Sequence, residues 1–204
     1  MIENQLQPMA LPEWVVSAIT DAPWELCYSQ GNEHLCFADL GMPVAQGRST
    51  LPPIFIAKML AAIEPNSQDY VLELGSSVMR VTSIIAKICC GVLLLESDED
   101  RYKADCEIAE NLEIRNLKCS FGIDFSALAE QKFSIIILNH AVREVPGLLF
   151  DLLQDNGRIC ALVGNELSQE MHLYTRNNSR IKKTVVFESR LELSKTFSND
   201  EFQL

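Results

Sequence analysis

The stretch VLELGSSVMR, residues 71–80, decides the fold of this 204-residue chain. Val71 to Leu74 form an apolar run interrupted only by Glu73, which is typical of a short buried strand. Gly75 follows at once, where the chain must turn, and glycine accepts backbone angles that other residues avoid. Residues 78–90 then have the composition of a helix. A strand, a glycine turn and a helix in this order indicate the first unit of a parallel α/β sheet.

The same alternation continues along the chain. Helices are predicted at residues 12–18, 53–63, 78–90, 99–112 and 145–153. Strands are predicted at residues 70–75, 91–97, 117–122, 133–140, 158–164, 170–176 and 183–189, with a tight turn at 155–157. The first five strands are almost continuously apolar, which is typical of a parallel sheet covered on both faces. The last two alternate with period two around residues 177–179 and predict an antiparallel hairpin. The fold class is therefore a three-layer α/β/α sandwich.

The first 50 residues differ in character from the rest. They carry scattered prolines and glycines, both tryptophans and only short periodic stretches. We interpret residues 1–50 as an N-terminal extension of helix and loops that packs on a main domain formed by residues 51–204.

The charge balance excludes a nucleic-acid-binding role. The chain has 17 Lys and Arg against 28 Asp and Glu, a net charge of −11. Neutralised phosphates supply most of the affinity for a nucleic-acid backbone, so an acidic surface is unsuited to it. The basic stripe at residues 176–183 is short and is interpreted as a solvated strand edge or turn.

The cysteines and the N-terminus favour a cytoplasmic protein. None of the seven cysteines forms a C-x-x-C pair, which indicates reduced thiols rather than disulfides. The three histidines lie too far apart to suggest a zinc site, so we expect no metal. The N-terminal residues lack a signal peptide, and the most apolar run, residues 84–95, is too short to span a bilayer. We therefore expect no membrane partner.

An acid follows the second predicted strand. Glu96 lies 21 residues after Gly75, a spacing that places a carboxylate to accept hydrogen bonds from ribose hydroxyls. The alternative is that the acidic cluster caps the next helix. Capping explains Asp98 and Glu99, but it does not explain an acid directly after the strand, so the ribose role is preferred.

Four segments carry a resemblance to a known family. They are PPIFIAKMLAAIEP (52–65), VLELG (71–75), LLLESD (93–98) and FSIIILNHAVREVPGLLFDLLQDNGRICALVG (133–164). Together they resemble the protein-L-isoaspartate O-methyltransferase family, from about Phe37 to about Ser189. The resemblance implies a Rossmann-like fold with a seven-stranded sheet, S-adenosylmethionine as cofactor and methyl transfer to isoaspartyl carboxylates of damaged proteins.

The resemblance also implies a set of cofactor-binding residues. The family's first motif reads roughly V-L-E-I-G-T-G-S-G, so Gly75 matches its first glycine, while Ser77 and Met79 replace the other two. Met79 would project either into the cofactor pocket or against the strand on which the helix packs. Arg80 could bind the cofactor's carboxylate, but we prefer the interpretation that it is exposed. His140, at a strand end, is a further candidate for the transfer pocket. The implied cofactor-binding residues are Glu73, Gly75, Ser76, Ser77, Glu96, Ser97, Gly122, Asp124 and Asn139.

The family's substrate motif, roughly G-Q-T-I-S-A-P, aligns on Pro53 with GRSTLPP, residues 47–53. Arg48 then replaces the glutamine, Ser49 the threonine, and Leu51 the hydroxyl residue that contacts the isoaspartyl carboxylate. Losing that hydroxyl costs roughly 1.5–3 kcal/mol of binding. Arg48, Ser49 and Thr50 are candidates to compensate, since arginine binds carboxylates well.

Three functions remain open at this point. The first is a methyltransferase of the isoaspartate type, acting on damaged proteins or peptides with altered motifs. The second is a catalytically inactive member that keeps the fold and binds a protein partner. The third, a nicotinamide-dependent oxidoreductase, is the weakest, because it needs the missing glycines even more to hold a pyrophosphate.

Overall fold

The computed structural model describes residues 2–28, 35–42, 49–122, 125–165 and 167–189. A seven-stranded sheet in the order β3-β2-β1-β4-β5-β6-β7 forms its centre. The strands are β1 (Tyr70–Leu74), β2 (Gly91–Glu96), β3 (Leu117–Phe121), β4 (Phe133–Val142), β5 (Leu153–Gly164), β6 (Gln169–Asn177) and β7 (Arg180–Ser189). Strands β1 to β5 pair in parallel, while β6 and β7 pair antiparallel. The predicted fold class is confirmed.

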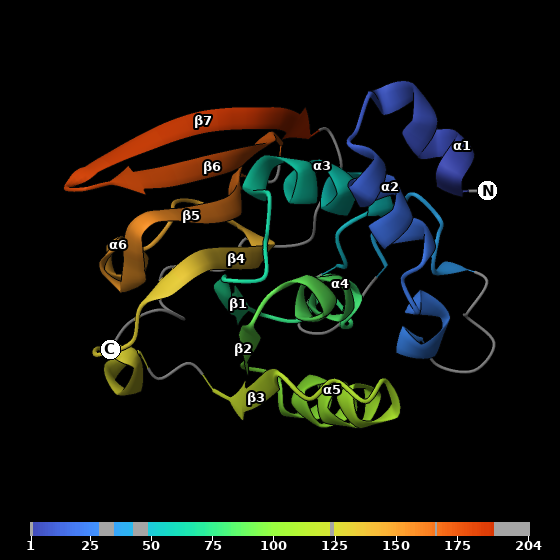
Figure 1. The fold of residues 1–204 in the computed structure, drawn as a ribbon, viewed down its shortest axis with the longest axis horizontal. Helices are drawn as coiled ribbons and strands as arrows, with labels where there is room; N and C mark the ends of the chain where they lie inside the picture. Colours follow the sequence, from blue (N-terminus) through green and yellow to red (C-terminus); the bar gives the residue numbers. More distant parts are fainter. Residues whose placement is uncertain (1, 29–34, 43–48, 123–124, 166, 190–204) are drawn as a thin grey trace.

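Helices lie on both faces of this sheet (Figure 1). The helices are α1 (Ile2–Leu6), α2 (Glu13–Thr20), α3 (Pro53–Ile63), α4 (Arg80–Ile88), α5 (Glu99–Asn111) and α6 (Gly147–Leu152). Short 3-10 turns are η1 (Gln7–Met9), η2 (Trp24–Cys27) and η4 (Ser126–Leu128). Helices α1 to α5 cover one face, and α6 with η4 covers the other.

The alternation of side chains along β1 explains this layering. Successive residues of a strand point to opposite faces, so Val71 joins the core under α1 to α5 and Leu72 joins the core under α6. Glu73 points to the same face as Val71, toward α4, and is the one charged residue of the strand. A fully buried carboxylate at the centre of a sheet needs partners, and they are found at the candidate site.

The N-terminal helices share a core with the sheet. Leu6, Val15, Ile19 and Trp24 are fully buried in the same cluster as Ile135 of β4. The boundary proposed at residue 50 therefore describes a change in sequence character, and it stays a prediction.

One local prediction is wrong. The tight turn expected at residues 155–157 is instead a bulge within β5. The pairing with β4 passes from Phe133–Leu153 to Ile135–Arg158, so the intervening β5 residues lie outside the regular register. Asn156 has φ 59°, a left-handed conformation that asparagine adopts more readily than most residues.

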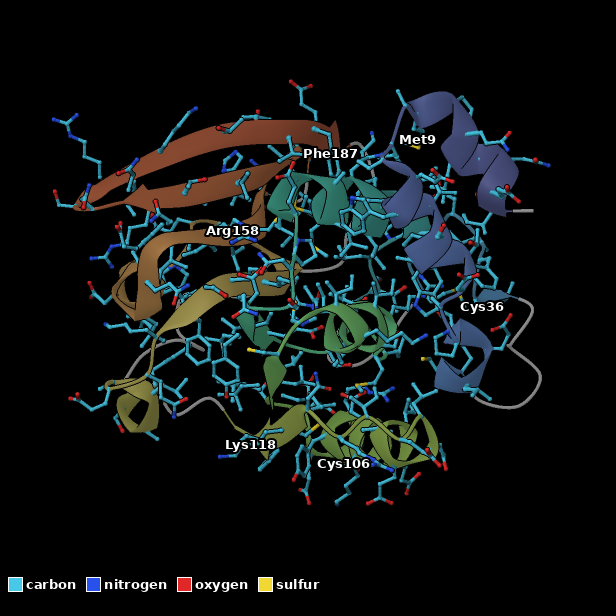
Figure 2. The ribbon with its side chains drawn as sticks, in the orientation of Figure 1. Met9, Cys36, Cys106, Lys118, Arg158 and Phe187 are labelled. Atoms are coloured by element: carbon cyan, nitrogen blue, oxygen red, sulfur yellow. The ribbon has the colours of Figure 1, made fainter. Side chains whose placement is uncertain are left out.

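Arg158, labelled in Figure 2, follows this bulge and links β5 to the segment between α3 and β1. Its guanidinium donates to the carbonyl oxygens of Ile63 and Glu64, at the end of α3, and forms an ion pair of 3.0 Å with Asp69. Asp69 also accepts the backbone N–H of Asn66 at 2.8 Å and so orders the turn between α3 and β1.

Within the described residues, no helix has the length and apolar character needed to cross a membrane.

Candidate functional site

The loop that follows β1 lies where the order of the sheet reverses. Strand β1 has β2 on one side and β4 on the other, and the connections run outward in opposite directions from this pair. Ligands of such sheets bind outside the carboxyl ends of the strands at this point. Gly75 begins the loop with φ +70° and donates its N–H to the carbonyl oxygen of Leu95 at 2.8 Å. Gly75 therefore begins the loop in a backbone conformation that favours glycine.

Glu96 holds this loop from the end of β2. One carboxylate oxygen accepts the backbone N–H of Ser76 at 2.8 Å, and the other accepts that of Asp98 at 2.9 Å. The Ser76 hydroxyl donates to Asp105 of α5 at 3.0 Å, and Asp105 is paired with Arg101 at 2.7 Å. Burial raises the pKa of Asp105 to about 6, against the opposing effect of Arg101. Glu96, the predicted ribose ligand, is thus fixed in place by backbone donors.

Ser77 and Met79, where the resemblance implied glycines, are both buried. The Ser77 hydroxyl accepts the backbone N–H of Leu51 at 3.0 Å and so joins the predicted substrate segment to the loop. Met79 is fully buried in the core beneath α1 to α4, which resolves the two orientations left open by the sequence. Val78 and Met79 both have left-handed φ angles, 47° and 60°, which are uncommon for residues with side chains.

Arg80 differs most from expectation, because the prediction that it is exposed is wrong. Its side chain is fully buried beneath residues of the N-terminal extension. The guanidinium donates to the carbonyl oxygens of Leu51 at 3.0 Å and Cys36 at 2.6 Å, and it lies over the rings of Trp24 and Tyr28. Desolvation lowers the pKa of Arg80. The residue anchors the extension to the start of α4.

The buried carboxyl of Glu73 connects β1, α4 and β4. It accepts hydrogen bonds from the Thr82 hydroxyl at 2.7 Å and from the Asn139 amide at 2.5 Å. Burial raises the pKa of Glu73 to about 7, and these two hydrogen bonds lower it in part. The same Asn139 amide nitrogen donates to the carbonyl oxygen of Gly75 at 2.7 Å. Two acceptors fix the orientation of this amide.

Two features lie at the end of β4, beside the loop that follows β1. The amide oxygen of Asn139 is buried and has no hydrogen-bond partner among the described residues. The His140 ring lies directly over Gly75, so that a side-chain carbon at Gly75 would lie 1.8 Å from Nε2. Asn139 and His140 thus join Gly75 and Glu96 in one cluster, as the positions of their strands in the sheet predict.

The remaining predicted residues are only partly described. Arg48 and Asp124 lie outside the described residues. Gly122 has φ +80° and donates its N–H to the Glu96 carbonyl oxygen at 2.8 Å, while Ser97 is half-buried beside it.

The predicted substrate segment divides into a buried part and an accessible part. Thr50 and Leu51 are buried, and the Thr50 hydroxyl accepts the N–H of Met42 at 3.0 Å and a guanidinium N–H of Arg80 at 3.3 Å. Ser49 is half-buried and therefore the more accessible of the described residues in this segment.

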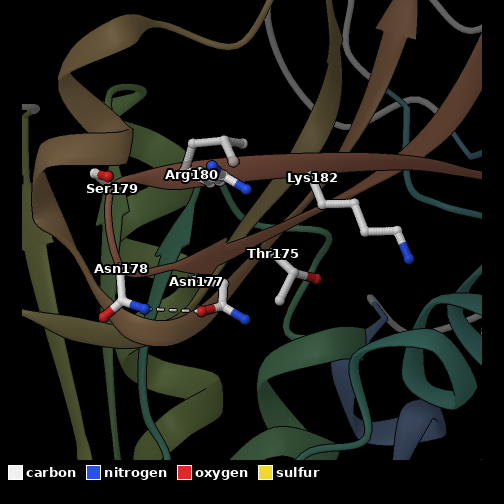
Figure 3. Close-up of a pocket in the computed structure, with 7 residues that line it drawn as sticks. Thr175, Asn177, Asn178, Ser179, Arg180 and Lys182 are labelled. Atoms are coloured by element: carbon white, nitrogen blue, oxygen red, sulfur yellow. Dashed lines mark hydrogen bonds between the residues drawn. The ribbon is translucent and has the colours of Figure 1, made fainter.

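A hollow lies away from this cluster, at the tip of the β6–β7 hairpin (Figure 3). Its volume is about 620 Å³ and its lining includes Asn178, Arg180 and Lys182. It belongs to the basic stripe, which forms the exposed hairpin as predicted. The sheet order separates it from β1 by β4 and β5, so it is not part of the candidate site.

Comparison with known proteins assigns the family. The family model described as protein-L-isoaspartate(D-aspartate) O-methyltransferase matches residues 2–191. This chain belongs to the protein-L-isoaspartate O-methyltransferase family. The resemblance inferred from the sequence motifs is thereby confirmed, and so is the expectation of an S-adenosylmethionine-dependent methyltransferase fold.

Relatives and solved structures agree with this membership. The protein-L-isoaspartate O-methyltransferase of Desulfosudis oleivorans is 25% identical over 186 residues, 90% of this chain and 84% of the relative. That of Pseudoalteromonas atlantica is 26% identical over 84% of this chain and 82% of its own length. A Plasmodium falciparum structure described as this methyltransferase, in complex with S-adenosyl-L-homocysteine, superimposes with a TM-score of 0.80 at 18% identity, covering 96% and 97% of the two chains.

Sequence reasoning missed two members of the buried network. Asp105 and Thr82 read as ordinary helix residues, although Asp105 contacts Ser76 and Thr82 contacts Glu73. The only available signal was the (i, i+4) spacing of Arg101 and Asp105, which also occurs on exposed helix surfaces.

Proposed function

We propose that this chain binds S-adenosylmethionine at the carboxyl ends of β1 and β4 and methylates isoaspartyl carboxylates in damaged proteins or peptides. The observation that carries the proposal is the family match over residues 2–191, which spans the loop after β1 and its partners. The proposal concerns both the cofactor and the substrate of this particular chain.

Three residues around the loop after β1 support the binding of such a cofactor. Gly75 has the positive φ angle and the missing side chain that allow a ligand to approach the turn. Glu96, fixed by two backbone donors, would accept hydrogen bonds from the ribose hydroxyls. The amide oxygen of Asn139, buried without a partner among the described residues, would accept one from the ammonium group of the methionine moiety.

Methyl transfer to a carboxylate requires the protein mainly to orient the two reacting groups. When bound, S-adenosylmethionine supplies a methyl group on a sulfonium, which is a good leaving group. The substrate carboxylate is already ionised at neutral pH. The chain must therefore align the two groups and exclude water, which is a contribution of proximity and orientation. We assign contact with the substrate to Ser49 together with Arg48, because Thr50 and Leu51 are buried against the rest of the protein.

The direct test is methyl transfer from isotopically labelled S-adenosylmethionine to a synthetic isoaspartyl peptide. The matched control is the same peptide with ordinary aspartate. We expect base-labile methyl ester on the isoaspartyl peptide alone, and micromolar binding of S-adenosylhomocysteine by calorimetry. A folded protein that neither transfers the methyl group nor binds the nucleoside at millimolar concentration would overturn the proposal and favour the inactive binding module.

Ser49→Ala separates substrate binding from cofactor binding. Loss of the hydroxyl should raise KM for the peptide roughly tenfold to a hundredfold, because one hydrogen bond to a charged group is worth about 1.5–3 kcal/mol. Affinity for S-adenosylhomocysteine should stay unchanged. An unchanged KM would remove Ser49 from the proposed substrate site.

A further inference from the structure

His140 lies in an irregular part of β4. The pairing of β4 with β5 passes from Leu138–Ala161 to Ala141–Leu162, so Asn139 and His140 fall between paired positions. Irregularities of this kind occur next to active sites, where they change the direction of a side chain. Here the His140 ring reaches across to the neighbouring strand and covers Gly75.

The contact with Gly75 is close along one edge of the ring. A carbon placed on Gly75 as a side chain would lie 1.8 Å from Nε2, 2.4 Å from Cδ2 and 3.0 Å from Cε1. The ring therefore fills the space that the missing side chain leaves. This is the space through which a glycine at this turn lets a ligand approach the backbone.

The backbone under the ring is fixed, whereas the ring is attached through rotatable bonds. Asn139 is tied to Glu73 and to the carbonyl oxygen of Gly75 by bonds of 2.5 and 2.7 Å. The His140 ring can change position through its two χ angles while the backbone of β4 stays in place.

We propose that the His140 ring occupies the approach to Gly75, and that cofactor binding displaces it. This inference rests on the proposed cofactor site. The closed ring reduces the fraction of molecules ready to bind, and apparent affinity falls by that fraction. On this proposal, His140 limits the affinity of this chain for the nucleoside. Ser77 and Met79, where the resemblance implied glycines, are not the residues that limit it.

The test compares binding of S-adenosylhomocysteine to wild type and His140→Ala by isothermal titration calorimetry. Removing the ring should tighten binding about tenfold or more, as expected if the open form is a tenth or less of the population. His172→Ala is the matched control. His172 is a second buried histidine of the same sheet, bonded to Tyr174 and Glu170 on β6, and its removal should leave affinity unchanged.

A second measurement reports on the ring itself. The His140 imidazole signals, assigned by their loss in His140→Ala, should shift on titration of the wild type with S-adenosylhomocysteine, while those of His172 should not. Thermal unfolding of each variant establishes that it is folded.

The outcomes separate this inference from the proposed function. Micromolar binding by wild type with equal or weaker binding by His140→Ala overturns the role of His140 and leaves the cofactor site standing. Absence of binding by both folded proteins overturns the cofactor site and the inference together. Micromolar binding by wild type, with binding about tenfold tighter or more by His140→Ala, supports both.

Discussion

Trp24 and Arg80 make two contacts with each other, a hydrogen bond and a cation–π contact. The indole N–H of Trp24 donates to the backbone carbonyl oxygen of Arg80 at 2.9 Å, and the guanidinium carbon of Arg80 lies 5.2 Å from the centre of a Trp24 ring. This pair joins the N-terminal extension to the helix that follows the candidate site. Cation–π contacts are stronger when both partners are desolvated, as they are here.

Arg80→Ala should destabilise the protein by about 3 kcal/mol in urea unfolding. The substitution removes a large buried side chain and leaves the carbonyl oxygens of Cys36 and Leu51 without their donor. Arg80→Lys keeps the charge but not the planar fork that reaches several acceptors, so an intermediate loss is expected. Wild-type stability in Arg80→Ala would contradict the anchoring role.

Glycine should be preferred to alanine at position 79. Met79 has φ 60°, and a residue with a Cβ in this region costs about 1–2 kcal/mol. Both substitutions lose the buried Met79 side chain, so their comparison isolates the backbone. Met79→Gly should therefore be more stable than Met79→Ala by about 1 kcal/mol.

The control pair is Met59→Gly and Met59→Ala, since Met59 is equally buried but lies inside α3. There alanine should be the more stable by about 1 kcal/mol, as in ordinary helix interiors. The same order at both positions would show that the loop relaxes when Met79 is replaced.

Stability should fall as the pH rises toward neutrality, because of Glu73. Its pKa in the folded protein is about 7, above the usual value of 4.5, so the folded state binds more protons between these values. Unfolding free energy then decreases with increasing pH in this window. Asp105, with a pKa raised to about 6, acts in the same direction.

Glu73→Gln removes this titration while its amide can still bond to Thr82 and Asn139. We expect the variant to gain up to about 3 kcal/mol relative to wild type at pH 8, and nothing at pH 4.5. The measurement is urea unfolding across this range, with the exposed Glu130→Gln as control. An equal pH dependence in wild type and Glu73→Gln would show that Glu73 ionises as readily in the folded state as in the unfolded one.

Ser77→Gly should be destabilising. The Ser77 hydroxyl is the acceptor for the Leu51 N–H, and a buried donor without its acceptor costs about 1–3 kcal/mol. Chemical denaturation measures the loss. Ser97→Gly, at a half-buried loop position, provides the control and should change stability much less.

The sheet and its helices could be predicted because their periods are local. The apolar run of β4 and the alternation of β6 and β7 are each visible within ten residues or fewer. The parallel order then brings Gly75, Glu96 and Asn139 to one edge of the sheet. The bulge in β5 was not visible in this way, because residues 155–157 carry the composition of a turn in either case.

The orientations of side chains within the site could not be predicted from the sequence. Arg80 is buried because it reaches Cys36, 44 residues away, and no local pattern records such a contact. The His140 ring depends likewise on a register shift between β4 and β5. The left-handed angles of Val78 and Met79 were hidden because glycine, the usual signal, is absent there.

The hydrogen bonds of Arg158 to three residues, Ile63, Glu64 and Asp69, also have a consequence for synthesis on the ribosome. The carbonyl oxygens of Ile63 and Glu64, at the end of α3, accept hydrogen bonds from Arg158, which lies 95 and 94 residues further along the chain. At about 5–20 residues per second, this interval lasts roughly 5–20 seconds. During this time α3 and the first strands emerge without the residue that fixes their junction. The junction between α3 and β1 is therefore completed only after β5 has been made.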